Sequence, residues 1–260
     1  WERTLRMSVL KCYRRTSPLL LQNGTWPAAY NGFDDENIGL FFGGGTESLL
    51  TLGHLLHEGI RPMLVSFGGP GWSGADPEAN PDKFLIDLKI SKEQGLKLLR
   101  IRTNFKEIFD ERAWRRSVKK GVNMMNAVLL MPYFISSVFP VVEQLRIGRL
   151  INGIEKTNFP HEYSCFSPLM TTLYGDLGKD VYYQSHLGHM YKEDVVRDLY
   201  CNHPEIAKYQ YSCWRNFHRR WCYQCESCFE YYALIKSHQI DPTLIGMDEK
   251  WFIERISEGA

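Results

Sequence analysis

Three consecutive glycines, Gly43 to Gly45, separate an apolar run from a helical pattern, and this arrangement most constrains the fold. The run Ile38–Phe42 predicts a short buried strand, and leucines then recur at helical spacing, at positions 49, 50, 52, 55 and 56. A strand, a glycine turn and a helix together present backbone N–H groups and a helix N-terminus to an anion. Glycine allows both the turn and the close approach of the anion. The stretch therefore predicts a phosphate-binding loop; the plainer alternative is a tight turn.

Strands and helices are expected to alternate along the chain. Further strands are predicted at residues 61–67, 98–102 and 149–153, and helices at 47–58, 84–96, 104–115 and 126–139. Gly59 is expected to end the first helix. The alternation predicts an α/β fold, in which a parallel sheet is flanked by helices, with a small C-terminal lobe. We expect three parts, an N-terminal extension at 1–36, an α/β domain at 37–180 and a helical lobe at 181–260.

Composition argues against two classes of partner. The 260 residues carry a net charge of +1, which gives no bulk attraction to nucleic acid or to an acidic membrane. No apolar run reaches the ~20 residues that span a bilayer. The basic pairs Arg115-Arg116 and Lys119-Lys120 are interpreted as a solvated face. We therefore expect a small-molecule or peptide substrate, with a homodimer compatible with the sequence, and a chain that starts at Trp1 as part of a longer one.

Four of the seven cysteines lie close together near the C-terminus. Cys213, Cys222, Cys225 and Cys228 have the spacing C-x8-C-x2-C-x2-C. Four thiolates suit tetrahedral zinc and leave no position open, so the pattern predicts a structural Zn²⁺ site. An iron–sulfur cluster and buried free thiols are the alternatives. A metal-binding set of thiols favours a reducing compartment, and we expect a cytoplasmic protein.

The glycine stretch Gly43-Gly44-Gly45-Thr46-Glu47-Ser48 resembles the pyrophosphate loop of the N-type ATP pyrophosphatases (PP-loop enzymes), usually Ser-Gly-Gly-x-Asp-Ser. Gly43 stands in place of the first serine, and Glu47 in place of the aspartate. The cysteine spacing resembles the second half of the signature in the branch that includes the 7-cyano-7-deazaguanine synthases. The resemblance implies a PP-loop domain of the HUP-like α/β class that binds ATP and Mg²⁺ and forms AMP and pyrophosphate.

Within that branch the chain more closely resembles the UDP-MurNAc-L-Ala-L-Glu epimerase family. That family has a Phe-Gly-Gly-Gly loop, an Asn-Glu-x-Ser element, a His-x-x-Ser segment, and Ser-Cys-x-x-Asn-Phe and Trp-Cys-x-x-Cys-x-x-Cys motifs. The matching segments here begin at Phe42, Ile154, His161, Ser212 and Trp221. Ile154 and Thr157 depart from the second of these motifs. The resemblance implies that a substrate carboxylate is adenylated and that the α-carbon of a terminal amino-acid residue is then epimerised.

The resemblance also implies roles for individual residues. The ATP-binding set is Gly43, Gly44, Gly45, Thr46, Ser48, Ser66 and Phe67. The catalytic set is Glu47, as a Mg²⁺ ligand, with Glu155, His161 and Tyr163 as candidate proton-transfer bases. The substrate-contacting set is Thr157, Ser164, Arg215 and Asn216.

Other histidines carry no motif. His54 and His57 on the first helix are interpreted as surface or packing residues. His186 and His189 lie three residues apart and are interpreted as polar packing, with a metal pair as the alternative. Two other functions remain open, a nitrile- or amide-forming ligase and a nucleotide-binding module without catalysis.

Overall fold

A computed structural model describes residues 34–68, 81–102, 140–156, 181–213 and 220–257, together with the single residues 138, 171 and 175. The chain divides into two units, residues 1–31 and residues 32–260, and all of the described residues belong to the second. The predicted helices at 104–115 and 126–139 lie outside the described residues, apart from Val138. Most of the predicted N-terminal extension, residues 1–36, also lies outside the described residues.

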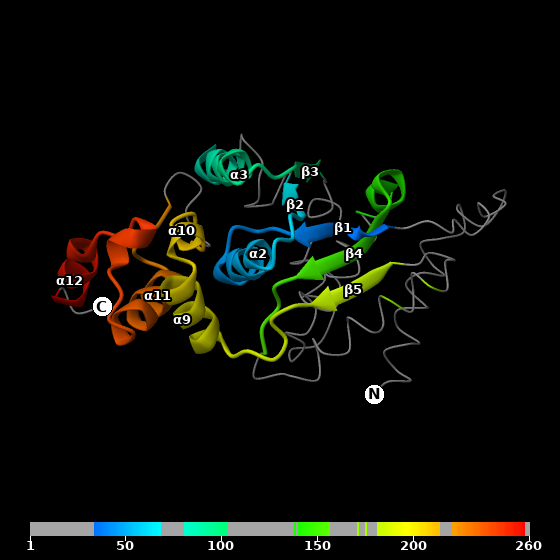
Figure 1. Ribbon diagram of the computed structural model, residues 1–260. Helices are drawn as coiled ribbons and strands as arrows, with labels where there is room; N and C mark the ends of the chain where they lie inside the picture. Colours follow the sequence, from blue (N-terminus) through cyan, green and yellow to red (C-terminus); the bar gives the residue numbers. More distant parts are fainter. Residues whose placement is uncertain are drawn as a thin grey trace, which may run out of the picture. The chain divides into compact units, whose positions relative to one another are not determined.

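Five parallel strands form one sheet in the order β3-β2-β1-β4-β5 (Figure 1). The strands are β1 (Asp34–Phe41), β2 (Met63–Gly68), β3 (Leu98–Arg102), β4 (Ile147–Asn152) and β5 (Tyr182–Ser185). Leu40 of β1 pairs with Leu64 of β2 on one side and with Ile151 of β4 on the other. The chain adds β2 and β3 on one side of β1, and β4 and β5 on the other. The boundary between β1 and β4 is therefore the point where ligands bind in open parallel sheets.

Helices flank this sheet, as the alternation predicted. The described helices are α2 (Thr46–His57), α3 (Pro81–Glu93), α9 (Lys192–Asn202), α10 (Pro204–Ala207), α11 (Glu226–Ser237), η1 (Pro242–Ile245) and α12 (Glu249–Ser257). Gly59 has φ +78° and donates its N–H to Leu56, while Ile60 donates to Leu55. These two hydrogen bonds end α2, as was expected of Gly59. In Figure 1 the strand arrows of β1, β4 and β5 point toward α9, α10 and α11.

The two faces of the sheet belong to two apolar clusters. Leu64 and Ile151 face α2 and pack with its leucines, whereas their neighbours Val65 and Leu150 pack with Val142 on the other face. This is the two-residue alternation of a strand that is covered on both sides. The first cluster continues through α9, α11 and α12 and includes Cys213, Cys225 and Cys228. The C-terminal helices and the α2 face of the sheet therefore share one core.

Three elements differ from the sequence expectation. α3 (Pro81–Glu93) begins and ends three residues before the predicted helix at 84–96, and the other two are strands. β1 begins at Asp34, within the part expected to be an extension, and Asp34 pairs with Ile147 of β4. β5 was not predicted, and it lies beyond the boundary expected at residue 180, although Tyr183 pairs with Leu150 of β4. The domain boundaries themselves stay predictions. Across the described helices, none combines the length and the apolar character that crossing a membrane requires.

Candidate functional site

The glycine loop lies at the carboxyl end of β1 and leads directly into α2. Gly44 has φ +69°, a conformation that favours glycine, and Gly45 is the N-cap of α2 with no side-chain cap hydrogen bond. The backbone of the loop is held from the C-terminal part of the chain, because Tyr211 N–H donates to the Gly44 carbonyl at 2.7 Å. The loop is therefore a fixed turn that opens onto a helix N-terminus, which is the geometry predicted for an anion site.

Glu47 occupies the first turn of α2, next to the loop. A Cβ built on Gly45 would lie 3.1 Å from Glu47 Oε2, so the carboxylate folds back over the loop. Burial, followed by the nearby Glu155 carboxylate, raises the pKa of Glu47 to about 7, and Lys192 opposes the shift. The structure thus brings together two residues of the predicted catalytic set, Glu47 after β1 and Glu155 after β4.

The pKa of Glu47 predicts a pH dependence of stability. A carboxyl whose pKa is raised in the folded protein costs stability when it ionises, so stability falls as pH rises from about 4.5 to about 7. We expect Glu47→Gln to remove this fall. The urea-unfolding free energies of the two proteins should be similar near pH ~4 and diverge in favour of the variant by pH ~8. A constant difference across that range would contradict the pKa assignment.

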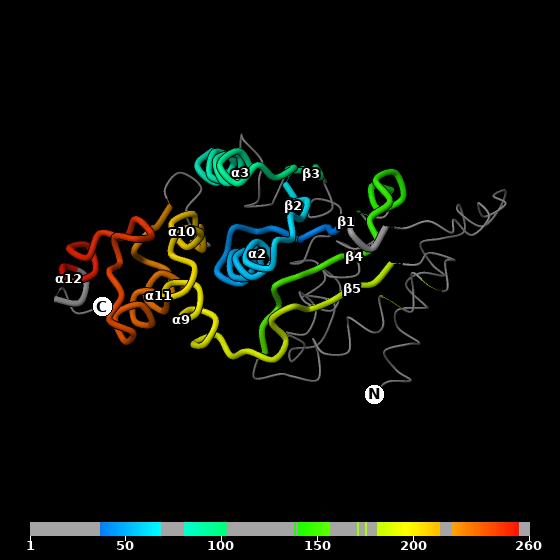
Figure 2. The backbone as a smooth tube through the Cα atoms, viewed as in Figure 1, coloured from blue at the N-terminus to red at the C-terminus, as the bar shows by residue number. Residues whose placement is uncertain are grey.

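The segment that follows β4 packs against the first turn of α2. A Cβ on Gly153 would lie 2.5 Å from the Glu47 carbonyl oxygen and 2.9 Å from Thr51 Oγ1. Thr51 Oγ1 itself donates to that carbonyl at 2.9 Å. Only a glycine lets β4 approach the start of α2 this closely, and Glu155 follows two residues later. Figure 2 shows the segments after β4 and β5 continuing together toward α9, where Lys156 N–H donates to the Met190 carbonyl at 2.7 Å.

Gly153→Ala is expected to push the first turn of α2 away from β4. The clash is with backbone, which cannot rotate aside, so we expect a loss of about 1–3 kcal/mol of unfolding free energy. Gly188→Ala is the control, because its Cβ would meet only ordinary contacts at 3.5 Å or more. Urea unfolding of both variants measures the difference, and equal stabilities would show that the close approach is not needed.

Lys83 of α3 supplies a buried cation beside the loop. A Cβ on Gly44 would lie 3.2 Å from Lys83 Nζ, and Nζ lies 2.9 Å from Asp87 Oδ2 one helical turn later. Both side chains are almost fully buried, with exposed fractions of 6% and 0%. Ser66 Oγ donates to Asp87 Oδ2 at 3.2 Å. Ser66, predicted to bind ATP, therefore orients this ion pair in the described structure. Neither Lys83 nor Asp87 was singled out from the sequence.

Two hydroxyls of the predicted ATP-binding set are already engaged. Ser48 Oγ donates to the Gly45 carbonyl at 3.1 Å, which is a bond within the helix. Thr46 is fully buried, and its Oγ1 accepts from Gln210 Nε2 at 3.1 Å. Backbone N–H groups, more than these hydroxyls, are what this loop can offer an anion.

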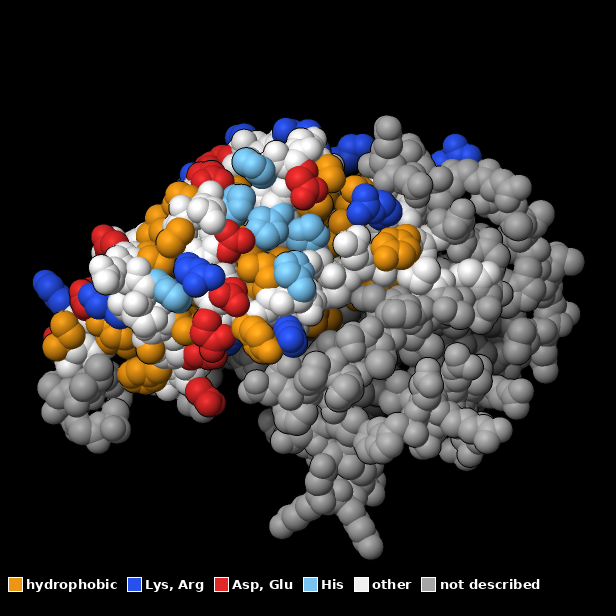
Figure 3. Space-filling view, turned by 60° about the horizontal axis from the view of Figure 1, so that its bottom comes forward, with side chains coloured by type: hydrophobic (Ala, Val, Ile, Leu, Met, Phe, Trp, Pro, Cys, Tyr) orange, Lys and Arg blue, Asp and Glu red, His pale blue; other side chains and the backbone are white. Residues whose placement is uncertain are grey.

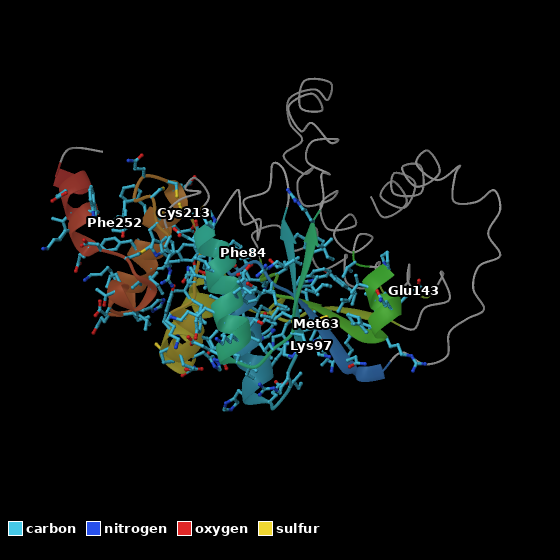
Figure 4. All side chains as sticks on the ribbon, turned by 90° about the horizontal axis from the view of Figure 1, so that it is seen from above. Met63, Phe84, Lys97, Glu143, Cys213 and Phe252 are labelled. Carbon is cyan, nitrogen blue, oxygen red and sulfur yellow. The ribbon has the colours of Figure 1, made fainter. Side chains whose placement is uncertain are left out.

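Residues 210–213 connect the loop to the cysteine cluster. Gln210 Nε2 also donates to Ser212 Oγ, and Cys213 follows directly. In Figure 4, Cys213 lies between α12, which carries Phe252, and α3, which carries Phe84. The four Sγ atoms are close, with Cys213–Cys225 at 4.0 Å, Cys222–Cys228 at 3.8 Å and Cys225–Cys228 at 3.4 Å.

These separations fit one tetrahedral metal ion. Thiolates at about 2.3 Å from zinc are about 3.8 Å apart, and no disulfide is formed among them. The hydrogen bond with Cys213 and burial raise the pKa of the Cys228 thiol. The four thiols can therefore ionise together only if a cation lies at the centre of the cluster. The cluster has the composition and geometry of a metal site, as the spacing predicted.

The remaining predicted residues lie outside the described part of the chain. They are Thr157, His161, Tyr163, Ser164, Arg215 and Asn216. Phe67, predicted to bind ATP, lies in β2, and its ring stacks on Phe41 with centroids 5.8 Å apart.

No family model matches this chain, and no curated protein matches it. The solved structures that are similar over most of its length include the following three. One is the U34-tRNA thiolase NcsA from Methanococcus maripaludis with its [4Fe-4S] cluster (16% identity, 86% of this chain and 72% of that chain, TM-score 0.40). The second is a predicted subunit of tRNA methyltransferase from Methanocaldococcus jannaschii (16% identity, 81% of this chain and 92% of that chain, TM-score 0.41). The third is NMN synthetase from Francisella tularensis (12% identity, 88% of this chain and 88% of that chain, TM-score 0.41). At these identities and TM-scores the likenesses say nothing about what this chain binds.

Proposed function

We propose that the chain binds ATP at the glycine loop and transfers AMP to a substrate carboxylate, with release of pyrophosphate. One observation carries the proposal: Gly44 and the uncapped start of α2 lie at the switch point of a parallel sheet, beside a buried lysine and two carboxylates. The motif resemblance of residues 42–48 to the PP-loop supports it.

Each part of the loop has a role in this proposal. The N–H groups of Gly44, Gly45 and Thr46 bind phosphate oxygens, and Lys83 adds positive charge at Gly44. Glu47 would hold Mg²⁺ through a carboxylate oxygen, because phosphates beside a carboxylate need a cation between them. The charge that develops on departing pyrophosphate is stabilised by the helix N-terminus and by Mg²⁺.

The proposed outcome of adenylation is epimerisation of a terminal amino-acid residue. Adenylation makes the α-proton of the activated residue more acidic, a base removes it, and a proton returns on the opposite face. Water then hydrolyses the acyl-adenylate to the epimerised carboxylate and AMP. Glu155 is the candidate base, and two observations support this choice: its carboxylate is close enough to Glu47 to raise the pKa of Glu47, and the chain resembles the muropeptide epimerases.

The test is pyrophosphate release with ATP and Mg²⁺ in the presence of UDP-muramoyl dipeptides, free peptides or 7-carboxy-7-deazaguanine. We expect release with a peptide carboxylate, and deuterium from solvent at its α-carbon. Release without deuterium would overturn the epimerisation step, and release with the deazaguanine acid alone would favour the ligase. ATP binding without turnover of any of these would favour a non-catalytic module.

We also propose that the four-cysteine cluster holds structural Zn²⁺. Three of its sulfurs are buried in the shared core, and the separations leave no position for substrate. Elemental analysis should find zinc bound at this cluster. A visible absorption band with iron in the sample would instead assign an iron–sulfur cluster.

A further inference from the structure

A group of histidines lies at the far end of α2 from the glycine loop. Figure 3 shows histidine side chains gathered on one face of the molecule. The group joins His54 in the last turn of α2, His186 after β5 and His203 after α9. Asp198 of α9 lies among them. The helix rises about 14 Å between Gly45 and His54, so this group is separate from the nucleotide site.

Donor atoms of this group converge on one point. His54 Nε2 lies 2.8 Å from Asp198 Oδ2, and one donor atom each from His54, Asp198 and His203 all lie within 4.8 Å of one another. Nitrogen and oxygen ligands of tetrahedral zinc lie about 3.3 Å apart, given bonds of about 2.0–2.1 Å. Side-chain rotations that move the atoms by about an ångström would bring them to that spacing.

The surrounding chain holds each donor in place. A Cβ on Gly53 would lie 2.8 Å from His203 Cγ, so the glycine lets the imidazole lie flat against α2. Asn202 Nδ2 donates to Asp198 Oδ1 at 2.6 Å, which leaves Oδ2 for the centre of the group. His54 Nδ1 lies 3.3 Å from His186 Nε2, so a hydrogen bond fixes the His54 ring and directs Nε2 inward. Such outer partners are typical of metal-binding histidines.

The electrostatics of the position also favour a cation. His54 and His57 stand in the last turn of α2, where the helix dipole is negative. Glu205 Oε1 lies 3.9 Å from His203 Nδ1 and adds negative charge.

We propose that His54, Asp198 and His203 bind a divalent transition metal ion of the zinc class, with His186 as a positioning residue for His54. Two imidazoles and one carboxylate match the ligand preference of zinc, and three protein ligands leave a fourth position to water. This site is distinct from the four-cysteine cluster and does not depend on the nucleotide chemistry.

The experiment is dialysis of the full chain against buffered Zn²⁺ followed by elemental analysis. We expect Asp198→Asn to hold one zinc per chain fewer than the unchanged protein, because it keeps the shape of the side chain but removes the anionic ligand. His238→Gln is the control, since His238 follows α11 outside the group. Equal zinc content in Asp198→Asn and the unchanged protein would overturn the site. His186→Ala should bind about 10–100-fold more weakly.

A second measurement covers the case in which Asp198→Asn does not fold. Ring-nitrogen NMR signals of His54 and His203 in the unchanged chain should shift on addition of Zn²⁺, after the four-cysteine cluster is saturated. The signals of His238 should not move. Unshifted signals from His54 and His203 would show that the group is a hydrogen-bond network alone.

Discussion

Removing the metal ion proposed for the four-cysteine cluster is expected to unfold the C-terminal helices. Bound zinc contributes on the order of 10 kcal/mol to a site of four thiolates, which is comparable to the whole stability of a domain. Cys213, Cys225 and Cys228 lie in the core that α2, α9, α11 and α12 share, so the loss should spread through it. Far-ultraviolet circular dichroism and urea unfolding before and after chelation measure the effect. Because residues 210–212 contact the glycine loop, nucleotide binding should be lost as well.

Cys225→Ser should reproduce the effect of chelation without a chelator. Cys201→Ser is the matched control, because Cys201 is an exposed thiol of α9 that lies outside the cluster. An unchanged urea midpoint in protein shown to be free of metal would contradict a structural role.

Replacing Asp87 by alanine is expected to cost about 3–5 kcal/mol of unfolding free energy. The change removes the Asp87 carboxylate, whose Oδ2 lies 2.9 Å from Lys83 Nζ. The Lys83 ammonium group is buried beside Gly44. A buried charge that loses its carboxylate is penalised far more than an exposed one. Urea unfolding measures the loss, and weaker nucleotide binding should accompany it, since Asp87 no longer holds Lys83 beside Gly44.

The same helix supplies the control for this prediction. Lys89 and Glu93 have the same four-residue spacing on α3, but their side chains are 63% and 40% exposed. Lys89→Gln should change the stability by no more than about 1 kcal/mol. The double replacement Lys83→Met with Asp87→Leu should recover much of the stability lost in Asp87→Ala, while nucleotide binding stays impaired. Equal losses for the Lys83–Asp87 and Lys89–Glu93 pairs would show that burial is not the cause.

Apolar patterning was enough to predict strands β1 to β4 and the first helix. The predicted strand at 98–102 has the bounds of β3, and the predicted helix at 47–58 differs from α2 by one residue at each end. β5 was missed because Tyr182-Tyr183-Gln184-Ser185 is short and ends in polar residues. The start of β1 was missed because Asp34-Asp35-Glu36 has no apolar signal, and pairing with β4 makes it a strand. Tertiary pairing overrides local propensity at both places.

The candidate functional site also contains residues that the sequence predicted and residues that it did not. The glycine loop and the four cysteines are local patterns, and both were found from spacing alone. Lys83 was missed because a lysine four residues before an aspartate is the usual sign of an exposed helix pair, as at Lys89 and Glu93. His54 and His186 are 132 residues apart, so nothing in the sequence indicates that their nitrogens meet. Contacts of this kind depend on the fold and not on the neighbouring residues.

The hydrogen bond from Gln210 to Thr46 joins residues 164 positions apart. This separation affects the order in which parts of the protein fold during synthesis. During synthesis β1 and α2 emerge early, but the groups that hold Gly44 and Thr46 emerge only with residues 210 and 211. Contacts at such long sequence separation form late in folding. The glycine loop therefore reaches its final shape only once residues 210 and 211 have been made, and a nascent chain that stops before Gln210 has the strand and the helix but not a finished loop between them.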